Sequence, residues 1–318
     1  MKINPPKISI VIPSFNQGQF IEETLLSIIN QSYTNWEIIV MDGGSSDQTV
    51  DILQKYDSNI AKWVSEPDQG QAHAINKGLE YCTGELFNWI NSDDYLMPGA
   101  LEDLANLYRK FPQGQIFCGY TYCFFDETKK ESHTYRMKFG KKVEDVFFDL
   151  EMNQPGSFVL TEMVKAVGGV NESLRYVFDN ELYYRLLCKY SNKGVVNSDN
   201  KWAGFRLHGD SKSVGEGFEG FEEERLGILG WVFREIGSIG TQISMPDTGK
   251  YQPRDWSWNY LDVKRFSLRV LASRLLSVSE KEGKAATVRI MIQLMQMGCF
   301  QYNRKNISLF FRQILGFS

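Results

Sequence analysis

The chain has 318 residues, of which 42% are apolar and 14% aromatic, so it can bury a sizeable core in one large domain or two smaller ones. Residues 261–318 hold ten Lys or Arg against three acidic residues, which leaves 25 basic and 36 acidic residues in the first 260. An acidic body of this kind is a poor binder of polyanions, so we expect no nucleic acid as the main partner.

The cysteines and the N-terminus indicate the compartment. Five cysteines without a Cys-x-x-Cys pair favour a reduced environment, with no disulfide framework and no zinc knuckle. The first apolar run, residues 8–12, is too short for the core of a signal peptide. No stretch approaches the roughly 18 to 20 apolar residues that span a bilayer. We therefore expect a cytoplasmic protein.

Short apolar runs alternate with stretches of helical period through the first 120 residues. The expected strands are about 8–12, 36–41, 60–64 and 86–90. The expected helices are about 20–29, 50–56 and 71–81. Such an alternation predicts an α/β fold with a mostly parallel central sheet and helices on both faces.

The pattern changes after about residue 115. Residues 115–125 and 133–139 resemble an antiparallel hairpin, followed by shorter mixed elements to about 215. The Gly-rich stretch 215–220 predicts a flexible joint, and the chain reads as mostly helical from Phe221 on. We expect a domain at 1–215, with halves at about 1–115 and 116–215, and a helical C-terminal region at 216–318.

Polar residues follow each of the four expected strands. The first strand runs into residues 13–16 (Pro-Ser-Phe-Asn), the second into Asp42, the third into residues 66–70 (Glu-Pro-Asp-Gln-Gly) and the fourth into residues 91–94 (Asn-Ser-Asp-Asp). Ligands of open parallel sheets bind beyond the carboxyl ends of the strands, so one shared polar crevice is expected. The purely structural alternatives are that Asp42 makes only a turn and that Asp68 only caps the next helix.

Adjacent carboxylates at Asp93 and Asp94 are the least easily explained as structural. They repel each other unless a positive group lies beside them, and a divalent cation that bridges to substrate phosphates is the usual solution. No Gly-x-x-x-x-Gly-Lys-Ser/Thr loop and no Gly-x-Gly-x-x-Gly follows the first strand. Their absence argues against a P-loop NTPase and against a dinucleotide-dependent oxidoreductase.

Three ordered motifs carry a family resemblance. They are residues 10–16 (Ile-Val-Ile-Pro-Ser-Phe-Asn), residues 42–49 (Asp-Gly-Gly-Ser-Ser-Asp-Gln-Thr) and residues 91–94 (Asn-Ser-Asp-Asp). Over roughly residues 6–213 the chain resembles the family 2 glycosyltransferases of bacterial polysaccharide synthesis. The resemblance implies the Rossmann-like GT-A fold, a nucleotide-sugar donor, inversion at the anomeric carbon, and Mn²⁺ or Mg²⁺ held by an Asp-x-Asp-type motif.

The resemblance also assigns residues of the donor site. Asp42 would hydrogen-bond the base, uracil being the commonest, and Asp94 would bind the metal. Two motifs depart from the usual form, because the common Asp-Asp-Gly-Ser reads Asp-Gly-Gly-Ser at 42–45 and the metal motif begins with the neutral Ser92. The residues implied to bind the nucleotide or the donor sugar are Pro13, Ser14, Asn16, Asp42, Asp68 and Asp93.

An inverting transfer needs a carboxylate that takes the proton from the acceptor hydroxyl. Residues 178–187 resemble the family segment that begins the helix beneath the acceptor site, and Asp179 matches the catalytic base there. Asp in the first turn of a helix is also a favoured cap, so a purely structural role is the alternative. Glu181 is the second candidate for the base and is also assigned to acceptor binding.

Further residues are expected around the metal and the acceptor. Residues 206–213 resemble a late family segment that reaches the metal or the diphosphate, and His208 is the expected second metal ligand, with a surface loop as the alternative. Gln154 belongs to a loop that resembles the acceptor side of the family. Trp202 is expected to stack on a sugar, although aromatic side chains at such positions are more often in the core.

The basic tail at 261–318 is expected to act outside catalysis. Packing on the catalytic domain or on a second subunit, as in a homodimer, is the simpler interpretation of its apolar clusters. The alternative is an interfacial helix at the inner face of the membrane, which suits a lipid-linked acceptor. The expected activity is transfer from a UDP-sugar to a saccharide or lipid-linked saccharide. A binding protein of the same fold that has lost turnover is the rival.

Overall fold

The computed structural model describes residues 4–209, 219–236, 251–267 and 269–270. The chain divides into two compact units. The first comprises residues 1–225 and 250–260, and the second comprises 226–249 and 261–318. Every residue discussed below as part of the site belongs to the first unit.

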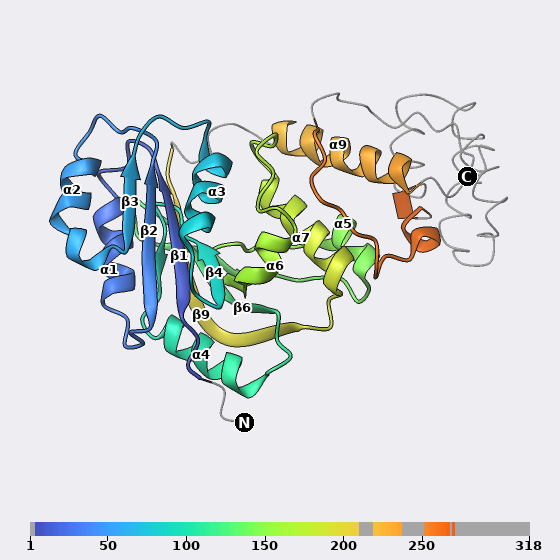
Figure 1. The fold of residues 1–318 in the computed structure, drawn as a ribbon, viewed down its shortest axis with the longest axis horizontal. Helices are drawn as coiled ribbons and strands as arrows, with labels where there is room; N and C mark the ends of the chain where they lie inside the picture. The colour runs from blue at the N-terminus through green and yellow to red at the C-terminus, as the bar shows by residue number, and fades with distance from the viewer. Residues whose placement is uncertain (1–3, 210–218, 237–250, 268, 271–318) are drawn as a thin grey trace. The chain divides into compact units, whose positions relative to one another are not determined.

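The first half of the first unit alternates strands and helices as expected (Figure 1). Its elements are β1 (Ile8–Ser14), α1 (Ile21–Ile29), β2 (Trp36–Asp42), α2 (Thr49–Lys55), β3 (Lys62–Ser65), α3 (Gln71–Tyr81), β4 (Leu86–Trp89), β5 (Tyr95–Leu96) and α4 (Ala100–Lys110). The remaining elements up to residue 207 are β6 (Ile116–Phe125), β7 (Glu131–Arg136), α5 (Val146–Asp149), β8 (Ser157–Leu160), α6 (Thr161–Ala166), α7 (Phe178–Tyr190) and β9 (Val195–Leu207).

All the strands of the described residues join in one sheet, in the order β3-β2-β1-β4-β8-β6-β9-β5, with β7 paired to β6. The pairs among β3, β2, β1 and β4 are parallel, and so is the pair of β6 and β9. β8 runs antiparallel to both β4 and β6. The expected α/β fold is therefore confirmed, with a parallel first half and a mixed second half.

β1 is buried along its whole length because helices cover both faces of the sheet (Figure 1). Ile10 and Ile12 join the main core cluster together with Leu25 of α1. On the opposite face, a Cβ added at Gly78 of α3 would lie 2.5 Å from the side chain of Val11. Glycine at this position therefore lets α3 approach the sheet closely.

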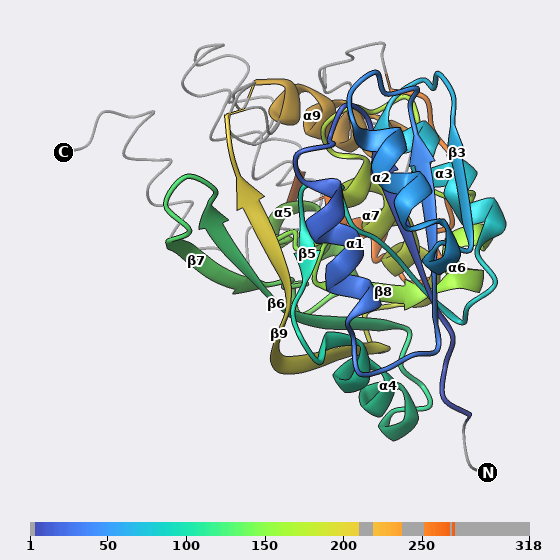
Figure 2. The ribbon, with the colours of Figure 1, turned by 90° about the vertical axis from the view of Figure 1, so that its left-hand side faces the viewer.

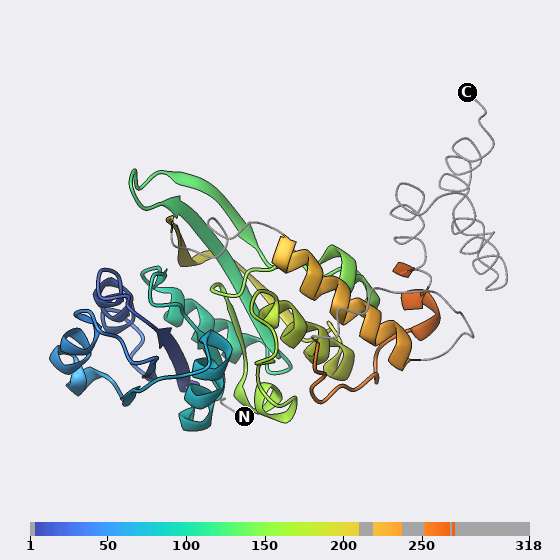
Figure 3. The ribbon, with the colours of Figure 1, turned by 90° about the horizontal axis from the view of Figure 1, so that it is seen from above.

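The hairpin expected near 115–139 is confirmed as β6 and β7, and Figure 2 shows β9 running beside β6. β7 is shorter than expected and ends at Arg136. Figure 3 shows the hairpin as a long green arm of the sheet. The parallel pairing of β6 with β9 brings the end of β9, residues 206–207, back beside Phe124 and Phe125.

The helical region begins with α9 (Glu219–Glu235), whose first residues, 219–225, belong to the first unit. Residues 251–256 have no regular secondary structure and pack in the first unit, where the Tyr251 hydroxyl donates to Glu181 Oε1 at 2.8 Å. Most of the tail at 261–318, including the apolar clusters beyond residue 270, lies outside the described residues. Among the helices that are described, none combines the length and the apolar character needed to cross a membrane.

Candidate active site

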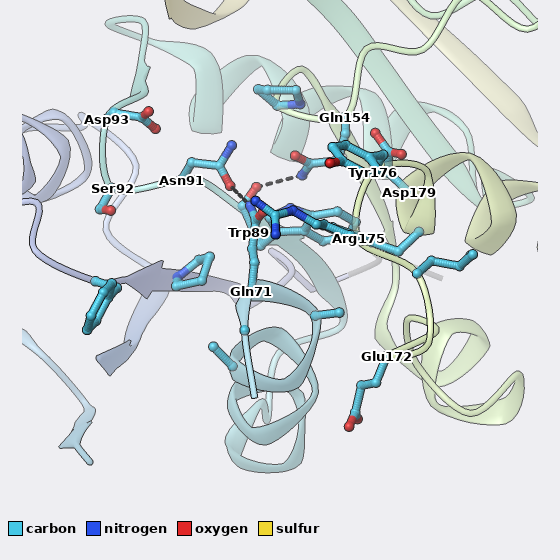
Figure 4. Close-up of a pocket in the computed structure, with 18 of the residues that line it drawn as sticks. Gln71, Trp89, Asn91, Ser92, Asp93, Gln154, Glu172, Arg175, Tyr176 and Asp179 are labelled. Carbon is cyan, nitrogen blue, oxygen red and sulfur yellow. Dashed lines mark hydrogen bonds between the residues drawn. The ribbon is translucent and has the colours of Figure 1, made fainter. Parts of the chain in front are cut away.

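A cavity of about 810 Å³ opens at the carboxyl ends of β1 and β4 and extends to the N-terminus of α7 (Figure 4). Half of the residues expected at the site line it: Pro13, Ser14, Asp68, Asp93, Gln154 and Asp179. The other half lie outside its lining: Asn16, Asp42, Asp94, Glu181, Trp202 and His208. The shared crevice expected from the strand ends is therefore present, with a different set of side chains around it.

Two polar atoms beside the end of β1 have no hydrogen-bond partner among the described residues. They are Ser14 Oγ and Gln17 Oε1, and both are buried. Buried polar atoms in proteins are almost always paired, so these two are suited to a polar ligand in the cavity that their residues line. Phe15, between them, also lines the cavity and keeps 59% of its surface exposed.

Asn16 and Asp42 build the turn next to the cavity. Asn16 has a φ of 52°, a left-handed conformation that Asn tolerates, and its amide N–H donates to Ser45 Oγ at 2.7 Å. Asp42 is 2% exposed, and its carboxylate accepts the Ser45 N–H at 2.9 Å and the Ser65 hydroxyl at 2.6 Å. The resemblance implies that Asp42 contacts the nucleotide base, and this contact stays a prediction. In the structure the Asp42 carboxylate is bonded to Ser45 and Ser65.

Asp68 and Gln71 form the side of the cavity at the start of α3. Asp68 Oδ1 accepts the N–H of Gly70 at 2.7 Å, so Asp68 both lines the cavity and orders the turn that begins α3. Gln71 Nε2 donates to Asn91 Oδ1 at 2.6 Å, as the dashed line in Figure 4 marks. This bond joins the segment that follows β3 to the segment that follows β4.

The adjacent carboxylates have different environments. Asp93 Oδ2 lies 2.9 Å from His208 Nε2, and their side chains are 18% and 9% exposed. Asp94 is 1% exposed, and its Oδ1 accepts the backbone N–H of Arg206 at 2.9 Å. Burial, together with the charge of Asp93, raises the pKa of the Asp94 carboxyl well above its usual value. Asp94 and His208 are the metal ligands that the resemblance implies, and this stays a prediction; in the structure the imidazole of His208 contacts Asp93.

Arg206 holds the end of β9 in place for this contact. Its side chain is 2% exposed, and its Nε donates to the carbonyl of Asp93 at 2.8 Å. The same guanidinium forms ion pairs with Glu23 and Asp126. Because Arg206 and Asp93 are fixed to each other, His208 is brought to the carboxylate of Asp93.

The far side of the cavity begins at α7. Asp179 lies in the first turn of this helix, and its Oδ1 accepts the N–H of Asn180 at 2.7 Å. Gln154 Nε2 donates to Asn88 Oδ1 at 2.7 Å and to the carbonyl of Trp89 at 2.6 Å. Figure 4 shows Gln154, Tyr176 and Asp179 together, with Asp93 on the opposite side of the labelled residues.

Glu181 and Trp202, expected at the acceptor site, lie in the interior. Glu181 and Arg185 form an ion pair at 2.6 Å in which both side chains are 0% exposed. Arg185 also donates to the backbone carbonyls of Val167 and Gly169. Trp202 is 0% exposed and belongs to the main core cluster, with its indole N–H donating to Asp103 at 2.7 Å. The core alternative fits the position of Trp202.

Several residues that line the cavity were not predicted from the sequence: Phe15, Gln71, Arg175, Tyr176 and Phe221. Phe15 carried a signal, since it directly follows an apolar strand and stands within a motif. Among the described residues that line the cavity, Arg175 is the one Lys or Arg, and its place just before the helix of Asp179 could have marked it. Phe221 carried no local signal, because only tertiary packing brings α9 to the cavity.

Residues 9–165 match the protein family model described as glycosyl transferase family 2. This match contains the end of β1, the turn after β2 and residues 91–94, and it ends before α7. The residues from Arg175 onward that line the cavity therefore lie outside the matched range.

Curated relatives agree with this match. An uncharacterized glycosyltransferase of Rickettsia typhi is 29% identical over 191 residues, which are 57% of this chain and 59% of the relative. An Escherichia coli protein named as a UDP-Glc:alpha-D-GlcNAc-diphosphoundecaprenol beta-1,3-glucosyltransferase is 36% identical over 96 residues, 30% of this chain and 38% of that protein. The chain thus spans at most about three fifths of these relatives.

Solved structures share the fold. A fragment of S. aureus TarS in complex with UDP-GlcNAc has a TM-score of 0.59 at 16% identity, covering 92% of this chain and 80% of that chain. At this identity the likeness concerns the GT-A-type fold alone. The motifs, the sheet order and the family match agree over residues 9–165, and this part of the chain belongs to glycosyl transferase family 2.

Proposed function

We propose that this protein transfers a sugar, with inversion, from a UDP-sugar to a hydroxyl of a saccharide or lipid-linked saccharide in the synthesis of a cell-surface polysaccharide. The E. coli relative is named for a UDP-Glc donor and a diphosphoundecaprenol-linked acceptor, and the TarS fragment was solved with UDP-GlcNAc. These names support a UDP-sugar as donor and a lipid-linked saccharide as acceptor.

One observation carries the proposal: a single cavity joins a donor side and an acceptor side. The donor side has the buried unpaired atoms Ser14 Oγ and Gln17 Oε1 and the exposed ring of Phe15. The acceptor side has Gln154 and the carboxylate of Asp179. A binding protein for a nucleotide sugar needs only the first of these, whereas a transferase needs both in one space.

Asp179 is the proposed general base. The acceptor hydroxyl attacks the anomeric carbon as the bond to the diphosphate breaks, and the Asp179 carboxylate takes the hydroxyl proton. Attack on the face opposite the leaving group inverts the configuration. Glu181, the second candidate, is fully buried in its ion pair with Arg185, so its carboxylate serves the structure.

The residues near the diphosphate position fit a divalent cation. Asp93 and His208 offer an oxygen and a nitrogen donor in contact, which suits Mg²⁺ or Mn²⁺ when phosphate oxygens and waters complete the coordination. Among the described residues, no group of three or more His, Cys, Asp or Glu side chains could hold a metal ion. The substrate must therefore supply ligands. Asp93 and His208 would hold the cation, which when bound would neutralise charge on the departing diphosphate.

The test is a panel of UDP-, GDP- and dTDP-sugars with Mn²⁺, in which nucleotide release is measured without acceptor. Release from a UDP-sugar, and inverted anomeric configuration of the product by NMR once an acceptor is found, are the expected results. A protein that binds a UDP-sugar and releases no UDP with any acceptor saccharide would be the rival, a binding protein of the same fold.

A further inference from the structure

Three consecutive backbone N–H groups before α7 donate to one carboxylate of α9. Arg175 N–H donates to Glu224 Oε1 at 2.7 Å, and Tyr176 and Val177 N–H donate to Glu224 Oε2 at 2.8 and 3.0 Å. The separation along the chain is 47 to 49 residues. Hydrogen bonds to an ionised acceptor are stronger than neutral ones, so this contact fixes the backbone of 175–177.

The same carboxylate lies at the N-terminus of α7 and accepts the N–H of its N-cap residue. Val177 is the N-cap residue of this helix, and its side chain makes no capping hydrogen bond. The first N–H groups of a helix have no partner within it, and a negative charge near them is favourable. Glu224 of α9 therefore provides a hydrogen-bond acceptor and a negative charge at this helix terminus, as a local capping side chain would. Asp179, the proposed base, lies two residues beyond Val177.

Packing of side chains supports this contact. The rings of Tyr176 and Phe221 lie 4.9 Å apart between centroids, and both residues line the cavity. A Cβ added at Gly220 would lie 2.4 Å from the Tyr176 ring, so the start of α9 is closely applied to this residue. The first two turns of α9 thus both anchor residues 175–177 and contribute a wall of the cavity.

We infer that Glu224 is a positioning residue for the acceptor side of the site. It holds residues 175–177, and through them the first turn of α7, in the place from which Asp179 reaches the acceptor hydroxyl. This inference rests on the proposed function. It also extends the catalytic unit to α9, beyond the residues that match the family model.

The test compares Glu224→Gln with wild type and with Glu222→Gln. Glu222 lies on the same helix with a side chain that is 54% exposed, and it forms an ion pair with Arg225 away from the cavity lining. Three measurements are made: hydrogen exchange of the amides of 175–177, UDP affinity, and steady-state kinetics against acceptor. Circular dichroism monitors folding of each variant.

Glu224→Gln is expected to speed hydrogen exchange of the 175–177 amides, because it weakens their charge-assisted hydrogen bonds. It should also lower kcat/KM for acceptor by about tenfold or more, which corresponds to about 1.4 kcal/mol or more. UDP affinity should stay at the wild-type level, because the donor side is built by other elements. Glu222→Gln should match wild type in all three measurements. Glu224→Asp, which keeps the charge, should recover part of the transfer.

Two outcomes separate the inference from the proposed function. If wild type releases no nucleotide from any sugar donor, the proposed function is wrong and the acceptor role of Glu224 falls with it. If wild type transfers sugar and Glu224→Gln transfers equally well, only the positioning role is wrong. Fast exchange of the 175–177 amides in wild type itself would contradict the contact without use of any variant.

Discussion

The donor side and the acceptor side of the cavity are built in different ways. On the donor side, the residues at the cavity come from the carboxyl ends of parallel strands, and the polar network around Glu37 lies at the amino ends of the same strands. On the acceptor side, the proposed base Asp179 is two residues from Glu181, which forms a fully buried ion pair. Along β1 and β2 binding and stability are separated, whereas on the acceptor side they are adjacent.

This difference determines what each region tolerates. A parallel sheet is fixed by its backbone pairing and its core, so the loops at its carboxyl ends can vary with little effect on the fold. The acceptor side relies on side chains that join segments distant in sequence, such as Arg185 with the carbonyls of Val167 and Gly169. Substitutions there are expected to change folding and catalysis together.

The largest effect is expected from Arg185→Met. Removing one partner of a buried ion pair leaves the other charge unpaired, which costs about 3–5 kcal/mol of unfolding free energy. Urea denaturation followed by fluorescence measures the loss. Lys138→Met is the control, because the pair of Lys138 with Glu151 is 67% and 52% exposed and should contribute less than about 1 kcal/mol.

A second variant checks the reason for this loss. Adding Glu181→Met to Arg185→Met removes the orphaned charge, so the double variant should regain part of the stability. If the double variant is less stable than Arg185→Met, then the hydrogen bonds that Glu181 accepts from Asn171 and Tyr251 matter more than its charge.

The next effect concerns catalysis alone. Asp179→Asn should lower transfer by at least about 10²-fold, the usual contribution of a general base, while UDP affinity stays unchanged. The control is Asp199→Asn, whose side chain is 98% exposed. Turnover near the wild-type rate would leave Asp179 as a helix cap and would contradict its role as the base.

A smaller effect is expected at the donor side from loss of the cation. Calorimetry should show UDP binding at least about tenfold weaker in EDTA than in Mn²⁺, and His208→Ala in Mn²⁺ should weaken binding in the same direction. His73→Ala is the control, because this ring accepts a hydrogen bond from the backbone N–H of Gln69 and does not line the cavity. Equal affinity in EDTA and Mn²⁺ would contradict the metal assignment.

The two regions also differ in what their sequence revealed. Ser14, Asp68 and Asp93 could be assigned to one cavity because parallel strands end at the same edge, a relation that the order of elements already contains. The contact of His208 with Asp93 depends on how Arg206 anchors β9. Burial determines which of the two adjacent carboxylates is accessible, and the hydrophobic periodicity of the sequence does not show which one is buried.

On the acceptor side the sequence identified the helix and its first turn but misjudged the neighbours. Trp202 begins a run of three buried residues in β9, and nothing local in the sequence distinguishes a core tryptophan from one that stacks on a sugar. Phe221 and Glu224 reach the site through contacts with residues more than 40 positions away. Their roles follow from tertiary packing alone.

The smallest effect is expected at Glu37, at the amino ends of the donor-side strands. Its carboxylate accepts hydrogen bonds from Ser9 and Thr83 at 2.6 Å and pairs with Lys7 at 2.6 Å. Burial by itself would raise the pKa of Glu37, but these partners outweigh it and hold the pKa below its usual value. The folded state therefore binds this proton more weakly than the unfolded chain does.

The sign of the pH dependence follows from that difference. The stability that Glu37 contributes is complete above its unfolded pKa, about 4.3, and is lost as the pH falls through the lower folded pKa. Wild type should thus exceed Glu37→Gln in stability at pH 7, and the gap should shrink below about pH 4. UDP affinity should be the same in both proteins at pH 7, because Glu37 lies at the end of β2 opposite to the cavity. A loss of UDP affinity in Glu37→Gln would mean that the donor side also couples its stability to its site, and the contrast between the two regions would no longer hold.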